Sequence, residues 1–176
     1  MFILADVNTD HVCGVPMRSR KASELVRAFE EAHDALTACG FQPLLHQIDH
    51  ETSKDLIKAI KERKSQCDIV PPANHGQNPA ERAIGIHKSH FASTINGLDK
   101  GHPQGGWDLL IPQVNMTLNM PRPRTVNSVH SAHAHTHGAF DFSAHPLAPL
   151  GCRAIVHQRQ VHNGGTCGGW ANKGKI

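Results

Sequence analysis

Short apolar segments alternate with segments of helical periodicity as far as residue 120, and this alternation narrows the choice of fold. Residues 2–5 and 11–16 flank a turn at residues 8–10, which predicts a β-hairpin. Residues 44–48 and 67–70 are short apolar runs, which predicts two buried strands. Strands that alternate with helices are typical of an α/β domain, and 176 residues suffice for a single core.

Four segments predict helices from the spacing of their apolar residues. They are residues 23–39, a stretch opened by Thr52 and Asp55, residues 79–91 and residues 107–120. The first stops at Gly40 and the last at Pro121, and both residue types commonly end helices. Helices therefore connect the hairpin to the third strand and the third strand to the fourth.

Two acids lie where predicted strands and helices end or begin. Asp49 ends the run 44–48, and Glu81 falls in the first turn of a helix that Asn78 caps and Pro79 opens. Carboxylates so placed can converge on one divalent metal ion. The pattern around Glu81 also resembles a capping box, in which the acid only satisfies backbone donors, and capping is its commoner use. Local sequence alone leaves both interpretations open.

Seven blocks of sequence, taken in order and with their spacings, carry a resemblance that covers most of the chain. They are VPMRSR at 15–20, IDHETS at 48–53, VPP at 70–72, AERAI at 80–84, WDLLIPQ at 107–113, TLNM at 117–120 and GAFDF at 138–142. Together they resemble the integrase catalytic domain of copia-like LTR retrotransposons, in the RNase H-like superfamily of retroviral integrases. The resemblance implies an RNase H-like α/β fold, a mixed sheet flanked by helices with an irregular C-terminal tail. It divides the chain into an integrase core, 1–125, and a His-rich linker with the remnant of a C-terminal β region, 126–176.

The resemblance also implies a function and its residues. Such integrases are polynucleotidyl transferases whose three carboxylates hold two Mg²⁺ or Mn²⁺ ions, hard cations that take oxygen ligands. Asp49 would be the second acid and Glu81 the third, both catalytic and metal-binding. Nucleic-acid contacts would come from Arg82, Lys88 and Asn78. The implied partners are DNA, as retroelement ends and target, and further copies of the chain in a homo-oligomer.

The first acid of the family has no match in this sequence. In the family it lies on the opening strand of the sheet, upstream of the hairpin, whereas here Met1 already falls inside the hairpin. Asp6 and Asp10 match hairpin positions and do not take over the role. We therefore expect a fragment that lacks the first strand and has little or no catalytic activity, although its family is one of metal-dependent enzymes.

One alternative function is a nucleic-acid-binding remnant that docks DNA or RNA without cutting it. Basic residues cluster at three places: Arg18, Arg20 and Lys21; Arg82 and Lys88; and Arg122 and Arg124. These side chains could contact phosphate groups. The commoner role of such a cluster is to form a solvent-exposed face that binds nothing. The net charge of +3 is too small to establish a nucleic-acid partner by itself.

A second alternative is a metal-binding module built from histidine. Of 15 histidines, four fall at positions 130, 133, 135 and 137. In an extended chain His133, His135 and His137 would share a face and could bind Zn²⁺, Ni²⁺ or Cu²⁺. Against this, no cysteine or carboxylate ligand lies at the spacing of a zinc site. The simpler explanation of the histidine cluster is a solvent-exposed loop that binds metal ions only adventitiously.

Cysteine usage and hydropathy bear on the compartment. The five cysteines form no C-x-x-C pair and are odd in number, which argues against a disulfide framework and favours reduced thiols. The apolar run after Met1 stops at Asp6, and no stretch approaches the length of a membrane span. We expect a soluble intracellular protein, in the nucleus or the cytoplasm, with no membrane partner.

Overall fold

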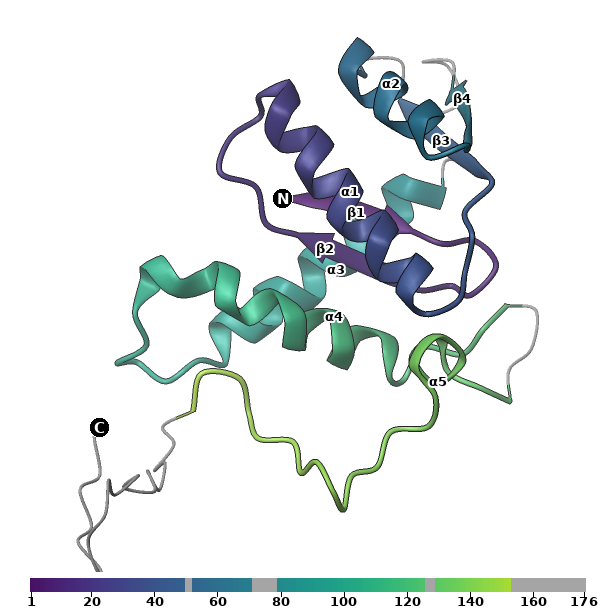
Figure 1. The fold of residues 1–176 in the computed structure, drawn as a ribbon. Coiled ribbons are helices and arrows are strands. Elements are labelled where there is room, and N and C mark those ends of the chain that lie inside the picture. Colours follow the sequence, from purple (N-terminus) through teal and green to yellow (C-terminus); the bar gives the residue numbers. More distant parts are fainter. Residues whose placement is uncertain (50–51, 71–78, 126–128, 153–176) are drawn as a thin grey trace, which may run out of the picture.

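The computed structural model describes residues 1–49, 52–70, 79–125 and 129–152, which form an α/β fold (Figure 1). In chain order the elements are β1 (Phe2–Ala5), β2 (Val12–Val15), α1 (Ala22–Ala38), β3 (Leu45–Asp49), α2 (Lys54–Glu62), β4 (Gln66–Val70), α3 (Pro79–Asn96), the 3-10 helix η2 (Gln104–Leu110), α4 (Ile111–Asn119) and α5 (Ala132–His137). The predicted hairpin, third and fourth strands and helices are all present, with boundaries that differ by a few residues. The prediction that the third and fourth strands are buried is wrong, because Leu45 is 55% exposed and Ile69 is 47% exposed.

The strands form two pairs. Strand β1 lies antiparallel to β2, with Ala5 opposite Val12, and β3 lies parallel to β4, with Asp49 opposite Val70. The antiparallel and parallel pairings of a mixed sheet are thus both present. Among the described residues they are two separate two-stranded sheets, with β1 and β3 each paired along one edge.

Helix α1 joins the two strand pairs. Its Ala28 and Ala32 are buried against Leu4 and Val15 of the hairpin. Phe29, one position along the same helix, is 2% exposed and packs in a second cluster with residues of α2, among them Ile60. The buried side of α1 therefore packs in both clusters, with Ala28 and Ala32 in the first and Phe29 in the second. Through these contacts α1 connects the β3–β4 pair to the hairpin.

Helices α3 and α4 cover the opposite face of the hairpin. Val12 of β2, Ala83 of α3 and Leu118 of α4 form a third buried cluster. Figure 1 shows α1 in front of the β1–β2 pair and the fainter α3 behind it. The period of two in a strand explains this layering, because Leu4 faces α1 while its neighbour Ile3 faces α3.

Capping residues and proline determine where the helices begin. Two of these starting positions differ from the prediction. The N-cap of α2 is Ser53, whose hydroxyl accepts from the Leu56 amide, and not Thr52. The predicted helix 107–120 is divided into η2 and α4, and Pro112 lies in the first turn of α4. Proline has no amide hydrogen and therefore suits a new helix start better than a helix interior.

The His-rich segment is helical, not extended as the sequence suggested. Ser131 caps α5 by accepting from the Ala134 amide, and Gly138, at φ +86°, ends it. In a helix, residues four apart share a face, so His133 and His137 lie together and His135 lies apart from them. The proposed row of three histidines on one side is therefore wrong.

No helix in the described parts of the chain is long and apolar enough to cross a membrane. Cys13, Cys39, Cys67 and Cys152 are free thiols.

Candidate functional site

Asp49 is the last residue of β3 and is exposed. Its backbone carbonyl accepts a hydrogen bond from the Thr52 hydroxyl at 2.5 Å. Because Asp49 is opposite Val70 in a parallel pair, β3 and β4 end at the same edge. The carboxyl ends of parallel strands are where α/β folds usually place ligands.

Glu81 lies in the first turn of α3 and is exposed, as predicted. Arg82 and Lys88 are exposed on the same helix, and Lys88 is seven positions from Glu81, hence on the same side. Ala83 and His87 form the buried face. Asn78, the predicted cap and nucleic-acid contact, lies outside the described residues, as does the whole segment 71–78 that leads from β4 into α3.

The two acids of the hairpin are structural. The Asp6 carboxylate accepts from both the amide (2.9 Å) and the hydroxyl (2.5 Å) of Thr9, inside the turn. The Asp10 carboxylate accepts from the amide (2.5 Å) and the hydroxyl (3.1 Å) of Thr125, 115 positions away. Asp10 has φ +57°, a conformation that aspartate tolerates better than most residues. Both acids therefore hold the hairpin, in agreement with the positions predicted for them.

The donor set of the described residues does not complete a two-ion centre. Within residues 1–49, 52–70, 79–125 and 129–152, no group of three or more His, Cys, Asp or Glu side chains is placed to hold a metal ion. A two-ion clamp needs carboxylates that include one shared by both ions. Asp49 and Glu81 carry oxygen donors of the kind that a hard cation takes, but no such group of three side chains among the described residues includes them.

A pair of amides on α4, which sequence reasoning missed, closes the outer edge of β2. Asn119 is fully buried, and its amide accepts from the Val12 N–H (2.9 Å) and donates to the Val12 carbonyl (2.8 Å). Asn115 makes the same pair of bonds to Gly14, each 2.9 Å long. The two side chains thus replace a neighbouring strand, and the only sequence signal was an asparagine repeat at helical spacing, i and i+4.

His87 of α3 is buried beside this ladder. Its Nε2 lies 2.9 Å from Asn115 Oδ1, and burial lowers the pKa of the ring, opposed by that hydrogen bond. The ring occupies the space above Gly14, where an added Cβ would lie 2.5 Å from Nε2. The polar ring on the buried face of α3 is therefore accommodated by a specific glycine and a specific amide.

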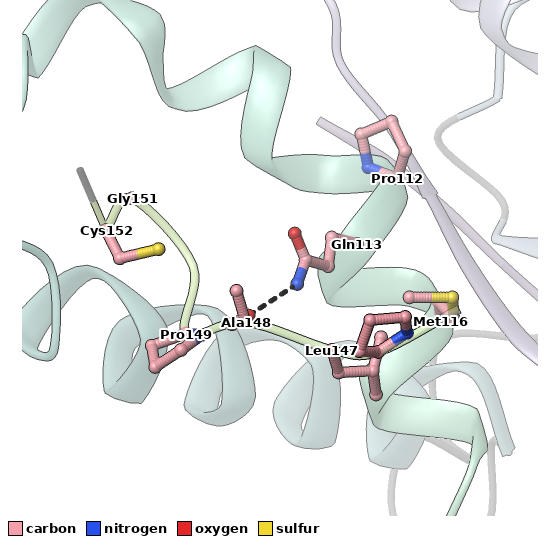
Figure 2. A pocket seen from close by; sticks show the side chains of 9 residues that line it. Pro112, Gln113, Met116, Leu147, Ala148, Pro149, Gly151 and Cys152 are labelled. Atoms are coloured by element: carbon pink, nitrogen blue, oxygen red, sulfur yellow. Dashed lines mark hydrogen bonds between the residues drawn. The ribbon is translucent and has the colours of Figure 1, made fainter. Parts of the chain in front are cut away.

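A surface cavity of about 550 Å³ lies between α4 and residues 146–152. Figure 2 shows Gln113 donating to the Ala148 carbonyl, a bond of 3.1 Å, across this cavity. The remaining lining residues are Pro112, Met116, Pro146, Leu147, Pro149, Gly151 and Cys152. The described residues of the lining include no carboxylate or imidazole, and the Cys152 thiol is the ionisable group among them.

A second cavity, about 320 Å³, lies among β2, α1, α4 and α5. Its lining comprises His11, Cys13, Ala32, Ala35, Leu36, Cys39, Pro112, Asn115, Met116, His133, Thr136 and His137. Burial, followed by the neighbouring His137 and His133, lowers the pKa of His11 to about 4. The ring is therefore neutral at pH 7. No local pattern in the sequence indicates that His137 meets Cys39, because the two residues are 98 positions apart along the chain.

No protein-family model matches the chain, and no curated protein matches it. Among solved structures, the catalytic core domain of BIV integrase is similar, with a TM-score of 0.54 and 13% sequence identity, over 76% of this chain and 82% of that one. At this identity the likeness shows the fold alone. It confirms the RNase H-like α/β fold of an integrase catalytic core, while the narrower, copia-like resemblance stays a prediction.

Proposed function

We propose that the chain is an integrase-derived domain for DNA integration, of the retrotransposon kind, whose capacity for phosphoryl transfer is lost or very weak. The observation that carries the proposal is the integrase-core fold together with Asp49 at the shared end of β3 and β4. Glu81, exposed in the first turn of α3, is the residue that the family resemblance makes the third acid, with Asp49 as the second. The fold supports the expectation of an integrase-like function, and the two carboxylates are groups that metal-dependent phosphoryl transfer uses.

The weakness of the transfer reaction follows from the carboxylates. Mg²⁺ or Mn²⁺, when bound, polarises a phosphoryl oxygen and lowers the pKa of a bound water. Asp49 and Glu81 are the residues that would hold such an ion. Asp6 and Asp10 are engaged by Thr9 and Thr125, and no third acid among the described residues completes the centre.

DNA is the partner that the basic residues would contact. Arg82 and Lys88 are exposed on α3 with Glu81, so a backbone phosphate near the acids can meet cationic side chains. The engaged state of the hairpin acids favours the second candidate function, a remnant that binds nucleic acid without cutting it. In both cases the basic residues position the polynucleotide, and the two functions differ in what happens at Asp49 and Glu81.

The test is a nicking and strand-transfer assay on duplex DNA with Mg²⁺ or Mn²⁺, run beside a DNA-binding titration by fluorescence anisotropy. We expect salt-sensitive binding that EDTA leaves unchanged, and at most slow nicking that Asp49→Asn and Glu81→Gln abolish. Arg82→Gln and Lys88→Gln should each lower the salt slope by about one. Lys58→Gln, on α2, is the matched control and should change neither quantity.

Two results would overturn the proposal. The absence of DNA binding at low salt would remove the integrase-derived function altogether. Fast metal-dependent nicking that survives both acid substitutions would show that other residues form the catalytic centre.

A further inference from the structure

The cavity of about 320 Å³ combines an apolar wall with a group of imidazoles. Leu36 of α1 and Met116 of α4 belong to the apolar wall. Three histidines also line the cavity, and their rings lie together: the His11 and His137 centroids are 5.5 Å apart, and those of His133 and His137 are 4.9 Å apart. The described lining includes no residue of β3 or α3, the elements of the candidate acids.

Two of these histidines have an unpaired nitrogen. His11 is 7% exposed and His133 is 9% exposed, and the Nδ1 atom of each is buried without a hydrogen-bond partner among the described residues. The hydroxyl and amide groups of the lining are already engaged: Thr136 donates to the Ala132 carbonyl at 2.7 Å, and Asn115 bonds the backbone of β2. A buried polar atom left unpaired is unfavourable. The two nitrogens are therefore the groups to which a polar atom of an occupant would bind.

The charge of the lining favours a neutral occupant. The described lining contains no Asp, Glu, Lys or Arg. Burial, followed by the charges of His137 and His133, lowers the pKa of His11 to about 4, and burial also lowers the pKa of His133. Both rings are therefore neutral at pH 7. A charged molecule would lose its hydration in the cavity without gaining an opposite charge, and this loss is costly.

The unpaired nitrogens favour a hydroxyl group on that occupant. A neutral imidazole carries one N–H, which can be on either nitrogen, so each Nδ1 atom either donates or accepts. A hydroxyl group both donates and accepts, so it satisfies either form, whereas a carbonyl only accepts. The volume of about 320 Å³ lies at the small end of the range for ligand cavities, about 300–1,000 Å³. A phenol or an alcohol of similar size suits this volume.

We propose that this cavity binds a small neutral molecule with an apolar body and a hydroxyl group, a phenol or an alcohol. The body lies against the apolar wall that includes Leu36 and Met116, and the hydroxyl group bonds the Nδ1 atom of His11 or His133. Ala35 and His137 line the cavity and are exposed, so the molecule can enter from solvent. A buried water could pair the same nitrogens, but it would leave the apolar wall without a contact.

The experiment is a fluorine NMR titration of the full chain with three probes that share a fluorophenyl body. They are para-fluorophenol, fluorobenzene, which lacks the hydroxyl group, and para-fluorobenzoate, which is charged at pH 7. We expect para-fluorophenol to bind with an affinity about tenfold higher than that of fluorobenzene, because it alone bonds the unpaired nitrogens. No binding of para-fluorobenzoate is expected over the same concentrations.

Two variants of α1 locate the binding. Ala35→Phe places a ring at the border of the cavity, and because Ala35 is exposed the fold should tolerate the larger side chain. This variant should lower the affinity for para-fluorophenol about tenfold or more. Ala38→Phe is the matched control, since Ala38 is exposed on the same helix outside the described lining, and it should leave the affinity unchanged.

A double variant tests the polar contact. His11→Phe with His133→Phe keeps two rings of similar size but removes their nitrogens, so it should bind para-fluorophenol and fluorobenzene with equal affinity. Circular dichroism shows whether this variant and the α1 variants are folded. If the double variant does not fold, the comparison of the three probes on the unsubstituted chain still tests the role of the hydroxyl group.

Any of four results would overturn the proposal. The first is that para-fluorophenol does not bind, and the second is that Ala35→Phe and Ala38→Phe bind it equally well. The third is that para-fluorobenzoate binds as tightly as para-fluorophenol, which would contradict the preference for a neutral molecule. The fourth is equal affinity for fluorobenzene and para-fluorophenol in the unsubstituted chain, which would assign the unpaired nitrogens to a buried water.

Discussion

The contact between His87 and Gly14 shows how one side chain restricts which residue types another position can hold. An added Cβ at position 14 would lie 2.5 Å from His87 Nε2 and 2.7 Å from Cε1. Distances this short force a ring that is fully buried to move. The sequence displayed a histidine in an apolar stripe, but it could not show that a glycine on a distant strand leaves room for the ring.

Gly14→Ala should lower the free energy of unfolding by about 1–3 kcal/mol, because overpacking displaces the His87 ring and its bond to Asn115. Urea denaturation followed by circular dichroism measures the effect. In the background of His87→Ala, the same substitution should be neutral or should stabilise by about 0.4–1 kcal/mol, since alanine then only restricts the unfolded chain. An equal loss in both backgrounds would show that the contact is not the cause.

Helix α4 acts as a surrogate strand. Its Asn115 and Asn119 satisfy the outward N–H and C=O groups of Gly14 and Val12, which a third strand would otherwise pair. Strand edges with unpaired backbone groups invite association with other chains. A side-chain ladder therefore protects an edge that the hairpin cannot protect by itself.

Asn119→Leu should lower the free energy of unfolding by about 2 kcal/mol or more. The substitution leaves the amide and carbonyl of Val12 buried without partners. Hydrogen exchange of the Val12 amide should accelerate more than that of β1 amides. Gln113→Leu is the matched control on the same helix, because its amide bonds only the Ala148 carbonyl at the surface, and it should cost less than about 1 kcal/mol.

Local patterns predicted the elements that local chemistry determines. The hairpin, α1 ending before Gly40, and α3 beginning at Pro79 all follow from turn residues, apolar spacing and caps. Helix α5 was missed because its six residues are too few for a periodicity, and Ser131 and Gly138 were not recognised as its ends. The α4 amide ladder and the meeting of Cys39 with His137 join residues about a hundred positions apart, and no local pattern encodes such contacts.

The placement of the candidate acids followed from the same local patterns. Asp49 and Glu81 each stand at the element boundary that the sequence indicated. Their joint action was inferred from the family resemblance and stays a prediction. The assignment of Asp6 to the hairpin is confirmed by its bonds to Thr9.

Six partly or fully buried histidines make the whole molecule sensitive to acid. Burial lowers the pKa of His11 and His46 to about 4, and it also lowers the pKa of His33, His87, His90 and His133. Above the unfolded-state pKa of about 6.5, both states hold neutral rings and stability is complete. Below it the unfolded chain takes up protons that the folded chain excludes, and stability falls as pH drops toward about 4.

The free energy of unfolding should therefore change little between about pH 7 and 8 and should fall between pH 6.5 and 5, by about 1.4 kcal/mol per pH unit for each ring that stays neutral when folded. Urea titrations in EDTA across this range measure it. The double variant His11→Gln with His46→Gln should show a shallower slope. The pKa values of Glu24 and Asp34 are lowered by hydrogen bonds, so these carboxylates stabilise the fold while ionised. They lose that stabilisation only as they protonate, which happens at lower pH than the histidine effect. A slope unchanged in the double variant would assign the acid sensitivity to other groups.

The bonds between α4 and β2 also have a consequence for the order in which the chain folds during synthesis. Val12 and Asn119 are 107 positions apart, and Gly14 and Asn115 are 101 apart. A ribosome adds about 5–20 residues per second, so the hairpin emerges roughly 5–20 seconds before the helix that completes it. During that interval β2 offers its outer backbone groups to any strand nearby, so the unfinished chain is more open to edge-to-edge pairing than the completed domain.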